Sequence, residues 1–277
     1  MDKQKIRRLL IGDLSIKRLI RSFVFICVAI YAFLLIYAYF FSERMIFLPG
    51  KSTYQDGPDI IKIETKDGMH ISAWYLPNTD AELTILYSHG NAEDIGAIRP
   101  YLEMLRDEGF SVLAYDYRGY GTSDGKPSER GVCQDVEAAY EYLLTQLNTA
   151  PNRIIAMGRS VGGAVALHLA CRKQVSGLVL ESSFVTAFRV VTHIPLLPFD
   201  RFRNIDKIKQ IRCPILVIHG KDDRIIPFWH GERLFREANE PKLHLWVAGA
   251  GHNDLVWVAG SRYWDVIGQF KNIVRSN

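Results

Sequence analysis

The stretch Arg153-Ile-Ile-Ala-Met-Gly-Arg-Ser-Val-Gly-Gly163 decides the fold. It begins with an apolar run typical of a buried strand, passes through Gly-x-Ser-x-Gly at 158–162 and continues into a helix-forming sequence rich in alanine and leucine. In this setting the turn is sharp, and Gly158 and Gly162 omit the side chains that would clash beside Ser160. Gly and Ser are common residues, so the pentapeptide alone is weak, and a tight turn with a bystander serine is the alternative. The setting favours a nucleophilic serine whose hydroxyl projects above the sheet.

Strands and helices alternate on both sides of this stretch. After a short first strand at 44–49, the pattern predicts strands at 60–64, 69–76, 83–87, 111–115, 153–157, 177–180, 214–218 and 243–247, and helices at 98–108, 132–147, 161–172, 228–238 and 261–274. Strands that alternate with helices of this length predict an α/β fold with a mostly parallel eight-stranded sheet and helices on both faces. Asp67-Gly68 between two alternating runs predicts a hairpin that adds antiparallel strands at one edge.

The N-terminus has a different composition from the rest of the chain. Residues 1–21 hold seven Lys and Arg against two Asp, so the remaining chain is close to neutral although the whole carries +4. Residues 22–42 have no charge and are nearly all apolar or aromatic, and about 20 such residues span the hydrocarbon core of a bilayer as a helix. A cleaved signal peptide and a buried core helix are the alternatives. The run ends in Tyr39-Phe40-Phe41 and lacks a small-residue cleavage site, and its place at an extreme terminus behind a basic flank disfavours a core helix.

These features predict a signal-anchor with three parts: a basic cytoplasmic tail at 1–21, a transmembrane helix at 22–42 and one domain at 45–277. Because Lys and Arg flank a span on its cytoplasmic side, we expect the domain to be extracytoplasmic, in a periplasm or a lumen. The lipid bilayer is the expected partner of the helix. The near-neutral domain gives no sign of a nucleic-acid-binding face.

A serine nucleophile needs a base and an acid that orients the base, which in this kind of fold follow it in the order Asp, then His. One late strand runs into His219-Gly-Lys-Asp-Asp223, and the last runs into Ala248-Gly-Ala-Gly-His252. Groups that act on a substrate lie at the carboxyl ends of parallel strands, so both loops can reach the site. His252 is the predicted base, and Asp222 and Asp223 compete for the role of the acid.

A developing oxyanion needs backbone N–H donors. The strand at 83–87 is followed by Ser88-His-Gly-Asn-Ala92, where Gly90 lets the backbone approach the substrate and the N–H just after it can donate. The second predicted donor is the N–H of Val161, which follows the nucleophile.

A third strand end carries charge in Asp116-Tyr-Arg-Gly-Tyr-Gly121. We expect Asp116 and Arg118 to tie this glycine-rich loop into place and to take no part in catalysis. The sequence has no metal-binding, Walker or dinucleotide-binding motif, so neither a metal nor a cofactor is expected.

Together these motifs resemble the α/β-hydrolase superfamily in its serine-nucleophile branch, and within it the membrane-associated α/β-hydrolase-domain-containing proteins of types 13 and 17 and their bacterial relatives. The matching stretches cover about residues 45–277 and are Ser88–Ala92, Asp116–Gly121, Gly158–Gly163, Ile218–Pro227 and Gly249–Asp254. The resemblance implies a triad of Ser160, Asp223 and His252 with oxyanion N–H groups on Asn91 and Val161. Type 17 enzymes, which remove palmitate from proteins, have an acylated cysteine-rich N-terminus; a transmembrane helix replaces it here, which favours the membrane-anchored relatives.

The segment at 182–205 interrupts the alternation and is rich in aromatic residues and proline. It is the expected cap of the hydrolase fold. Its apolar side chains, among them Phe184, Phe188, Leu196 and Leu197, either line an acyl pocket or simply pack onto the sheet.

The sequence therefore predicts a membrane-anchored serine hydrolase that cleaves carboxylic esters or thioesters of acyl-bearing substrates, such as a lipid or a lipidated protein, through an acyl-enzyme. Two alternatives remain. One is an aminopeptidase-like amide hydrolase of the same fold, and the other is a non-catalytic membrane scaffold.

Overall fold

The computed structural model describes residue 2 and residues 16–277, and it divides into two compact units at Met45 and Ile46. Most of the predicted basic tail, residues 1 and 3–15, lies outside the described residues. The first unit contains helix α2 (Ile16–Ile46), whose 31 residues include the predicted span. This helix is long and apolar enough to cross a membrane.

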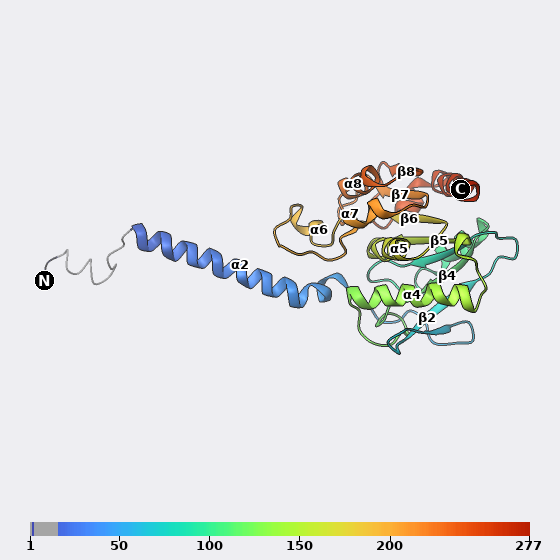
Figure 1. The fold of residues 1–277 in the computed structure, drawn as a ribbon, viewed down its shortest axis with the longest axis horizontal. Coiled ribbons are helices and arrows are strands. Elements are labelled where there is room, and N and C mark those ends of the chain that lie inside the picture. The colour runs from blue at the N-terminus through green and yellow to red at the C-terminus, as the bar shows by residue number, and fades with distance from the viewer. Residues whose placement is uncertain (1, 3–15) are drawn as a thin grey trace. The chain divides into compact units, whose positions relative to one another are not determined.

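The second unit is built on one sheet of eight strands (Figure 1). The strands are β1 (Ile61–Glu64), β2 (His70–Leu76), β3 (Thr84–Ser88), β4 (Ser111–Tyr115), β5 (Ile154–Arg159), β6 (Gly177–Glu181), β7 (Ile215–Gly220) and β8 (Lys242–Val247). Their order is β1-β2-β4-β3-β5-β6-β7-β8, with antiparallel pairing only at β1–β2 and β2–β4. The mostly parallel sheet and its antiparallel edge hairpin are as predicted from the sequence.

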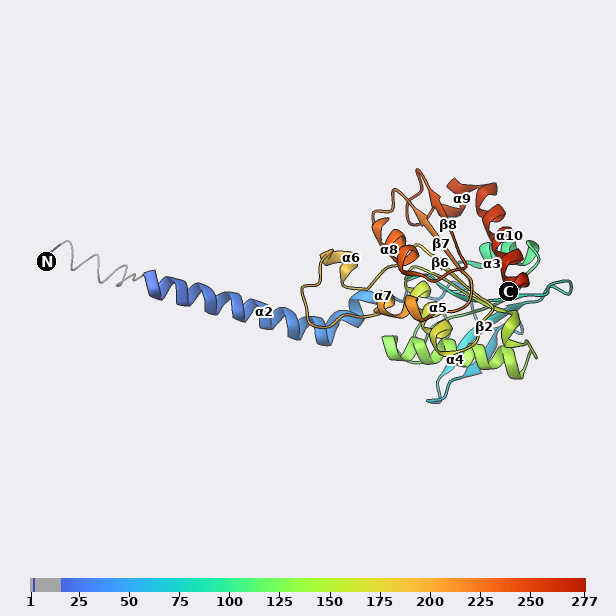
Figure 2. The same cartoon turned by 45° about the horizontal axis from the view of Figure 1, so that its top comes forward.

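Helices cover both faces of this sheet. They are α3 (Arg99–Asp107), α4 (Glu129–Thr145), α5 (Val161–Arg172), α6 (Arg189–Thr192), α7 (Asn204–Lys207), α8 (Trp229–Glu237), α9 (Leu255–Ala259) and α10 (Ser261–Ser276), with short 3-10 turns at Pro151–Arg153 and Ile208–Gln210. Buried residues of α3, α9 and α10 form one core layer, and those of α4, α5 and α8 form the other. Figure 2 shows α3 and α10 together on one side, away from α4 and α5.

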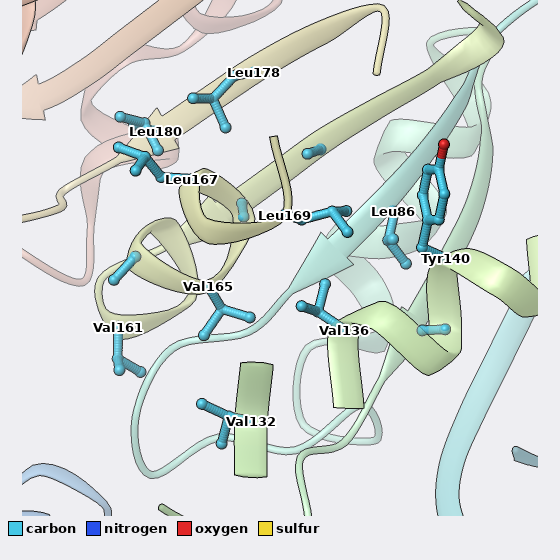
Figure 3. Packing of buried hydrophobic residues seen from close by; sticks show 14 of the residues in the cluster. Leu86, Val132, Val136, Tyr140, Val161, Val165, Leu167, Leu169, Leu178 and Leu180 are labelled. Carbon is cyan, nitrogen blue, oxygen red and sulfur yellow. The ribbon is translucent and has the colours of Figure 1, made fainter. Parts of the chain in front are cut away.

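The strands supply alternate residues to these two layers. In β5, Ile154 and Ala156 face α4 and α5, while Ile155 and Met157 face α3 and α10. Figure 3 shows the layer that contains α4 and α5, where valines of α5 lie beside valines of α4. The alternation fixes which way each residue at the end of a strand points, and the site depends on it.

One predicted element is wrong: residues 44–49 do not form a strand. Helix α2 continues to Ile46, and Phe47 is buried with its ring 6.0 Å from that of Phe202. The backbone N–H of Leu48 donates to Asn91 Oδ1 at 2.8 Å. Because this N–H bonds to a side chain, and not to a neighbouring strand, the segment leads the chain into the domain without joining the sheet.

Candidate active site

Ser160 occupies a strained turn between β5 and α5. Its φ of 56° and ψ of −119° lie in a region that residues other than glycine rarely adopt. The turn is held by Ser160 N–H donating to the carbonyl of Glu181 at 2.8 Å and by Gly163 N–H donating to the carbonyl of Ser160 at 3.1 Å. These bonds run to the neighbouring strand and to the new helix, so the surrounding structure fixes the conformation.

The two glycines beside Ser160 are required by close backbone contacts. A Cβ on Gly158 would lie 2.1 Å from the carbonyl oxygen of Gly162, and one on Gly162 would lie 2.0 Å from the carbonyl oxygen of Ser88. Both separations are far below van der Waals contact. The turn between β5 and α5 therefore packs directly onto the end of β3.

Asp223 and His252 meet above the ends of β7 and β8. The Asp223 Oδ1 accepts the backbone N–H groups of Ile225 at 2.9 Å and Ile226 at 2.8 Å, and its Oδ2 lies 2.7 Å from His252 Nδ1. Burial opposes ionisation of Asp223, but hydrogen bonds from His219 and His252 outweigh it and lower the pKa of this carboxyl. Of the two candidate acids, Asp223 contacts the histidine, whereas Asp222 is exposed.

Ser160 and His252 lie on loops that are joined through a neighbouring residue. Among the described residues, the Ser160 hydroxyl makes no hydrogen bond to the His252 ring. The guanidinium of Arg159 links the two loops, because its Nη2 donates to the carbonyl of His252 at 3.0 Å and to Asn253 Oδ1 at 2.7 Å. Catalytic hydrogen bonds are often long before substrate binds, so the arrangement remains compatible with proton transfer.

The two predicted oxyanion donors come from the ends of β3 and β5. In the described part of the chain, neither the backbone N–H of Asn91 nor that of Val161 has a hydrogen-bond partner. Val161 is the first residue of α5, where backbone N–H groups have no partner within the helix. The side chain of Asn91 is held by Leu48 N–H and, at 2.7 Å, by the Tyr120 hydroxyl, which fixes the loop that carries its N–H.

A cluster of charged residues beneath these loops was not predicted from the sequence. Arg159 pairs with Glu93, and its Nε lies 3.7 Å from Oε1 of Glu181. Glu181 also accepts the hydroxyl of Tyr263 at 2.7 Å, and burial raises the pKa of this carboxyl. The sequence held one signal for this cluster, the alternation of side chains in β5. It places Arg159 on the same face as Ile155 and Met157, which is the face covered by α3 and α10.

A cavity of about 110 Å³ lies beside this cluster. It is lined by Tyr87, Ile98, Pro100, Tyr101, Met104, Arg159, Glu181, His252, Asn253, Leu255, Val256 and Trp257. None of the four predicted acyl-pocket residues lines it. Phe184 is buried with its ring 6.4 Å from that of Phe202, Phe188 stacks edge-on with Phe199, Leu196 is exposed and Leu197 is half-buried.

Asp116 and Arg118 tie loops together. Asp116 accepts the backbone N–H of Ile95 and the hydroxyl of Tyr54, and burial raises the pKa of this carboxyl to about 7. Arg118 pairs with Asp67 and Asp135, each at 2.8 Å. In the described residues, no three His, Cys, Asp or Glu side chains are grouped so that they could hold a metal ion.

The sheet order, the strained serine between strand and helix, and the Asp–His pair on later loops are those of an α/β hydrolase. The chain belongs to the α/β-hydrolase superfamily and is a hydrolase of that fold. It is similar to α/β-hydrolase domain-containing protein 17B of Homo sapiens, with 36% identity over 74% of this chain and 72% of that protein. It is also similar to an uncharacterised protein of Mycobacterium tuberculosis, with 37% identity over 82% of this chain and 86% of that protein.

Two further comparisons agree with this membership. A family model described as serine aminopeptidase, S33, matches residues 79–198, which include Ser160 but end before Asp223 and His252. The fold is similar to that of an esterase from Pyrococcus furiosus, with a TM-score of 0.69 and 22% identity over 81% of this chain and 96% of that chain.

Proposed function

We propose that this chain is a membrane-anchored serine hydrolase that cleaves carboxylic ester or thioester bonds of acyl-bearing substrates. The observation that carries the proposal is the 2.7 Å contact between His252 Nδ1 and Asp223 Oδ2. This pair follows the carboxyl ends of β7 and β8, at the same edge of the sheet as the strained Ser160 after β5. A buried, ionised carboxylate on one nitrogen of an imidazole fixes the tautomer in which the other nitrogen accepts a proton.

In the proposed reaction, His252 Nε2 takes the proton of the Ser160 hydroxyl as its oxygen attacks the substrate carbonyl. The backbone N–H groups of Asn91 and Val161 donate to the oxyanion that forms, and the low pKa of Asp223 keeps it charged beside the imidazolium. His252 then gives its proton to the leaving alcohol or thiol. Water, deprotonated by His252, then attacks the acyl carbonyl, and His252 returns the proton to the Ser160 oxygen as the bond to the acyl group breaks and the acid is released.

The anchoring part of the proposal assigns 22–42 to the membrane, 1–21 to the cytoplasm and 45–277 to the opposite side. Its support is the long apolar helix α2 and the excess of Lys and Arg before the uncharged stretch at 22–42. A reporter that is active only in the cytoplasm, fused after Asn277, is expected to be inactive; activity of that fusion would reverse the orientation.

The cap at 182–205 is the proposed contact surface for the acyl chain. Phe188, Leu196 and Leu197 are partly or wholly exposed and are therefore accessible to a substrate, whereas Phe184 is held in the core beside Phe202. Replacing Phe188 or Leu197 by Ala is expected to lower kcat/KM for long acyl esters more than for acetate esters. Equal losses of kcat/KM for long acyl esters and acetate esters would show that the cap does not contact the acyl chain.

Amide hydrolysis is the second candidate, and the match of residues 79–198 to the serine aminopeptidase model favours it. The two activities differ in the leaving group and in the need to bind a substrate amine. A comparison of p-nitrophenyl esters, acyl thioesters and aminoacyl p-nitroanilides on the full-length protein separates them. Faster turnover of the anilides would replace the ester proposal.

The nucleophile itself is tested with a fluorophosphonate probe, which reacts covalently with activated serines. The full-length protein is expected to be labelled, Ser160→Ala is expected to lose the label, and Ser261→Ala, at an exposed serine, is expected to keep it. Labelling that persists in Ser160→Ala, or is lost in Ser261→Ala, would exclude Ser160 as the nucleophile.

A further inference from the structure

Arg159 lies next to the proposed nucleophile in the chain, and its guanidinium reaches the end of β6 and the loops after β3 and β8. The side chain is mostly buried, with 16% of its surface exposed. Because it follows Met157 in the alternation of β5, it points to the side of the sheet covered by α3 and α10. Its guanidinium reaches the loop that carries His252, where Nη2 contacts the carbonyl of that residue.

The first contact of Arg159 is to the oxyanion loop. Its Nη1 pairs with Oε1 of Glu93, and Oε2 of the same carboxylate accepts the backbone N–H of Gly90 at 3.0 Å. Gly90 precedes Asn91, whose N–H is the proposed oxyanion donor. A displacement of the guanidinium therefore passes through Glu93 to the peptide that directly precedes the one carrying the proposed oxyanion donor.

The second contact is to the loop of the base. Nη2 donates to the carbonyl of His252 and to Asn253 Oδ1, so it holds the backbone of the histidine. Asp223 holds the ring of the same residue through Nδ1. The position of His252 is thus set jointly by Asp223 and Arg159.

The third contact fixes the guanidinium itself. Arg159 and Glu181 are direct partners in the register of β5 and β6, and the Arg159 Nε lies 3.7 Å from Oε1 of Glu181, whose Oε2 is held by Tyr263. A planar guanidinium has donors in fixed directions and can serve these partners at once, whereas an ammonium is a single point of charge. The directions of these partners therefore fit an arginine side chain better than a lysine side chain.

We propose that Arg159 is a positioning residue that sets the base loop and the oxyanion loop at their working distances from Ser160. The inference rests on the proposed function, since it needs Ser160 to be the nucleophile. Arg159 touches none of the reacting atoms; it acts through Glu93 and through the backbone of His252. Misplacement of catalytic groups by about 1 Å can cost about 10²-fold in rate, which sets the size of the effect.

The test compares Arg159→Ala, Arg159→Lys and a control, Arg172→Ala, in the full-length protein. Arg172 lies on α5 and pairs at the surface with Glu137. We expect Arg159→Ala to lower kcat and the rate of fluorophosphonate labelling about 10²-fold while KM changes by no more than about threefold, because substrate binding is unaffected. Arg159→Lys is expected to recover only a small part of the loss, and Arg172→Ala is expected to match the wild type.

Chemical rescue separates positioning from a structural role. Guanidinium ion at non-denaturing concentration is expected to raise the labelling rate of Arg159→Ala several-fold, and ammonium ion is expected to have no such effect. Rescue by neither ion, full recovery with lysine, or a loss confined to KM would overturn the proposal. If Arg159→Ala does not fold, Glu93→Gln and Asn253→Ala replace it, and wild-type kcat in both would overturn it equally. Failure of the proposed function is read separately, as labelling that persists in Ser160→Ala.

Discussion

Replacement of Asp223 by Asn changes one atom of the proposed triad and leaves its surroundings in place. Oδ1 can still accept the N–H groups of Ile225 and Ile226, so the side chain keeps its orientation. The amide nitrogen then stands where Oδ2 was, 2.7 Å from His252 Nδ1. Because an amide N–H donates and does not accept, His252 must present an unprotonated Nδ1 and carry its proton on Nε2. That tautomer has no lone pair for the Ser160 proton.

The expected loss of turnover follows from the wrong tautomer of His252, and the expected small loss of stability follows from the contacts that the Asp223→Asn side chain would retain through Oδ1. In an unrelated serine protease the same change costs about 10⁴-fold in kcat, which corresponds to about 5 kcal/mol of transition-state stabilisation. We expect a loss of this order here. Stability is expected to change much less, because the two backbone hydrogen bonds of Oδ1 remain.

The assay is turnover of a p-nitrophenyl ester near pH 8, with urea unfolding measured in parallel. Asp222→Asn is the matched control: it has the same chemistry one residue away, but Asp222 is exposed and does not contact His252. Wild-type turnover in Asp223→Asn, or a larger loss in Asp222→Asn, would refute the assignment of the acid. A loss of turnover that tracks a loss of folded protein would refute the tautomer explanation.

Two further perturbations test other parts of the structure. Gly162→Ala puts a Cβ 2.0 Å from the carbonyl oxygen of Ser88 and is expected to lower the free energy of unfolding in urea by about 1–3 kcal/mol or more. The control Gly268→Ala in α10, with open space around it, is expected to be neutral or stabilising. Equal effects of the two substitutions would contradict the close packing at Gly162. In the folded protein the pKa of the Asp116 carboxyl is raised to about 7, so this group stays protonated at pH values where it is ionised in the unfolded chain. The free energy of unfolding should therefore fall as pH rises from about 4 to about 7, by up to about 1.4 kcal/mol per pH unit. Asp116→Asn should remove that slope, and an unchanged slope between pH 5 and pH 7 would mean that another group causes it.

Much of the domain could be predicted because its signals are local. Alternating strands and helices, the Asp67-Gly68 hairpin and the glycines around Ser160 are each visible within a few residues of sequence. The loops with Asp223 and His252 could also be located, because the carboxyl ends of parallel strands meet at one edge. The choice between Asp222 and Asp223 needed either the family resemblance or the geometry, since neighbouring residues of one turn point in different directions.

The failures have a common cause in contacts between distant parts of the chain. Residues 44–49 have the apolar composition of a strand, but Phe47 packs on Phe202, far away in sequence, and the Leu48 N–H is taken by Asn91. The cluster of Arg159, Glu93 and Glu181 was missed for the same reason, because its members are separated by other strands and helices in the sequence. Only the side of the strand on which Arg159 lies could have been inferred.

The order of the strands explains why such a cluster is needed at this position. Ser160 follows β5 and His252 follows β8, with β6 and β7 between them, so the two strand ends are roughly 14 Å apart at the usual strand spacing. In the proposed mechanism the loop after β8 therefore has to return across two strands so that the imidazole reaches the serine. Asp223, at the end of β7, holds the ring from a neighbouring strand. Arg159 reaches from β5, the strand that directly precedes Ser160, lies beside Glu181 of β6 and holds the loop through the His252 carbonyl. Under the proposal, Arg159 adds to the attachments of this loop at β7 and β8 a contact from β5, and this contact fixes the distance between the loop and Ser160.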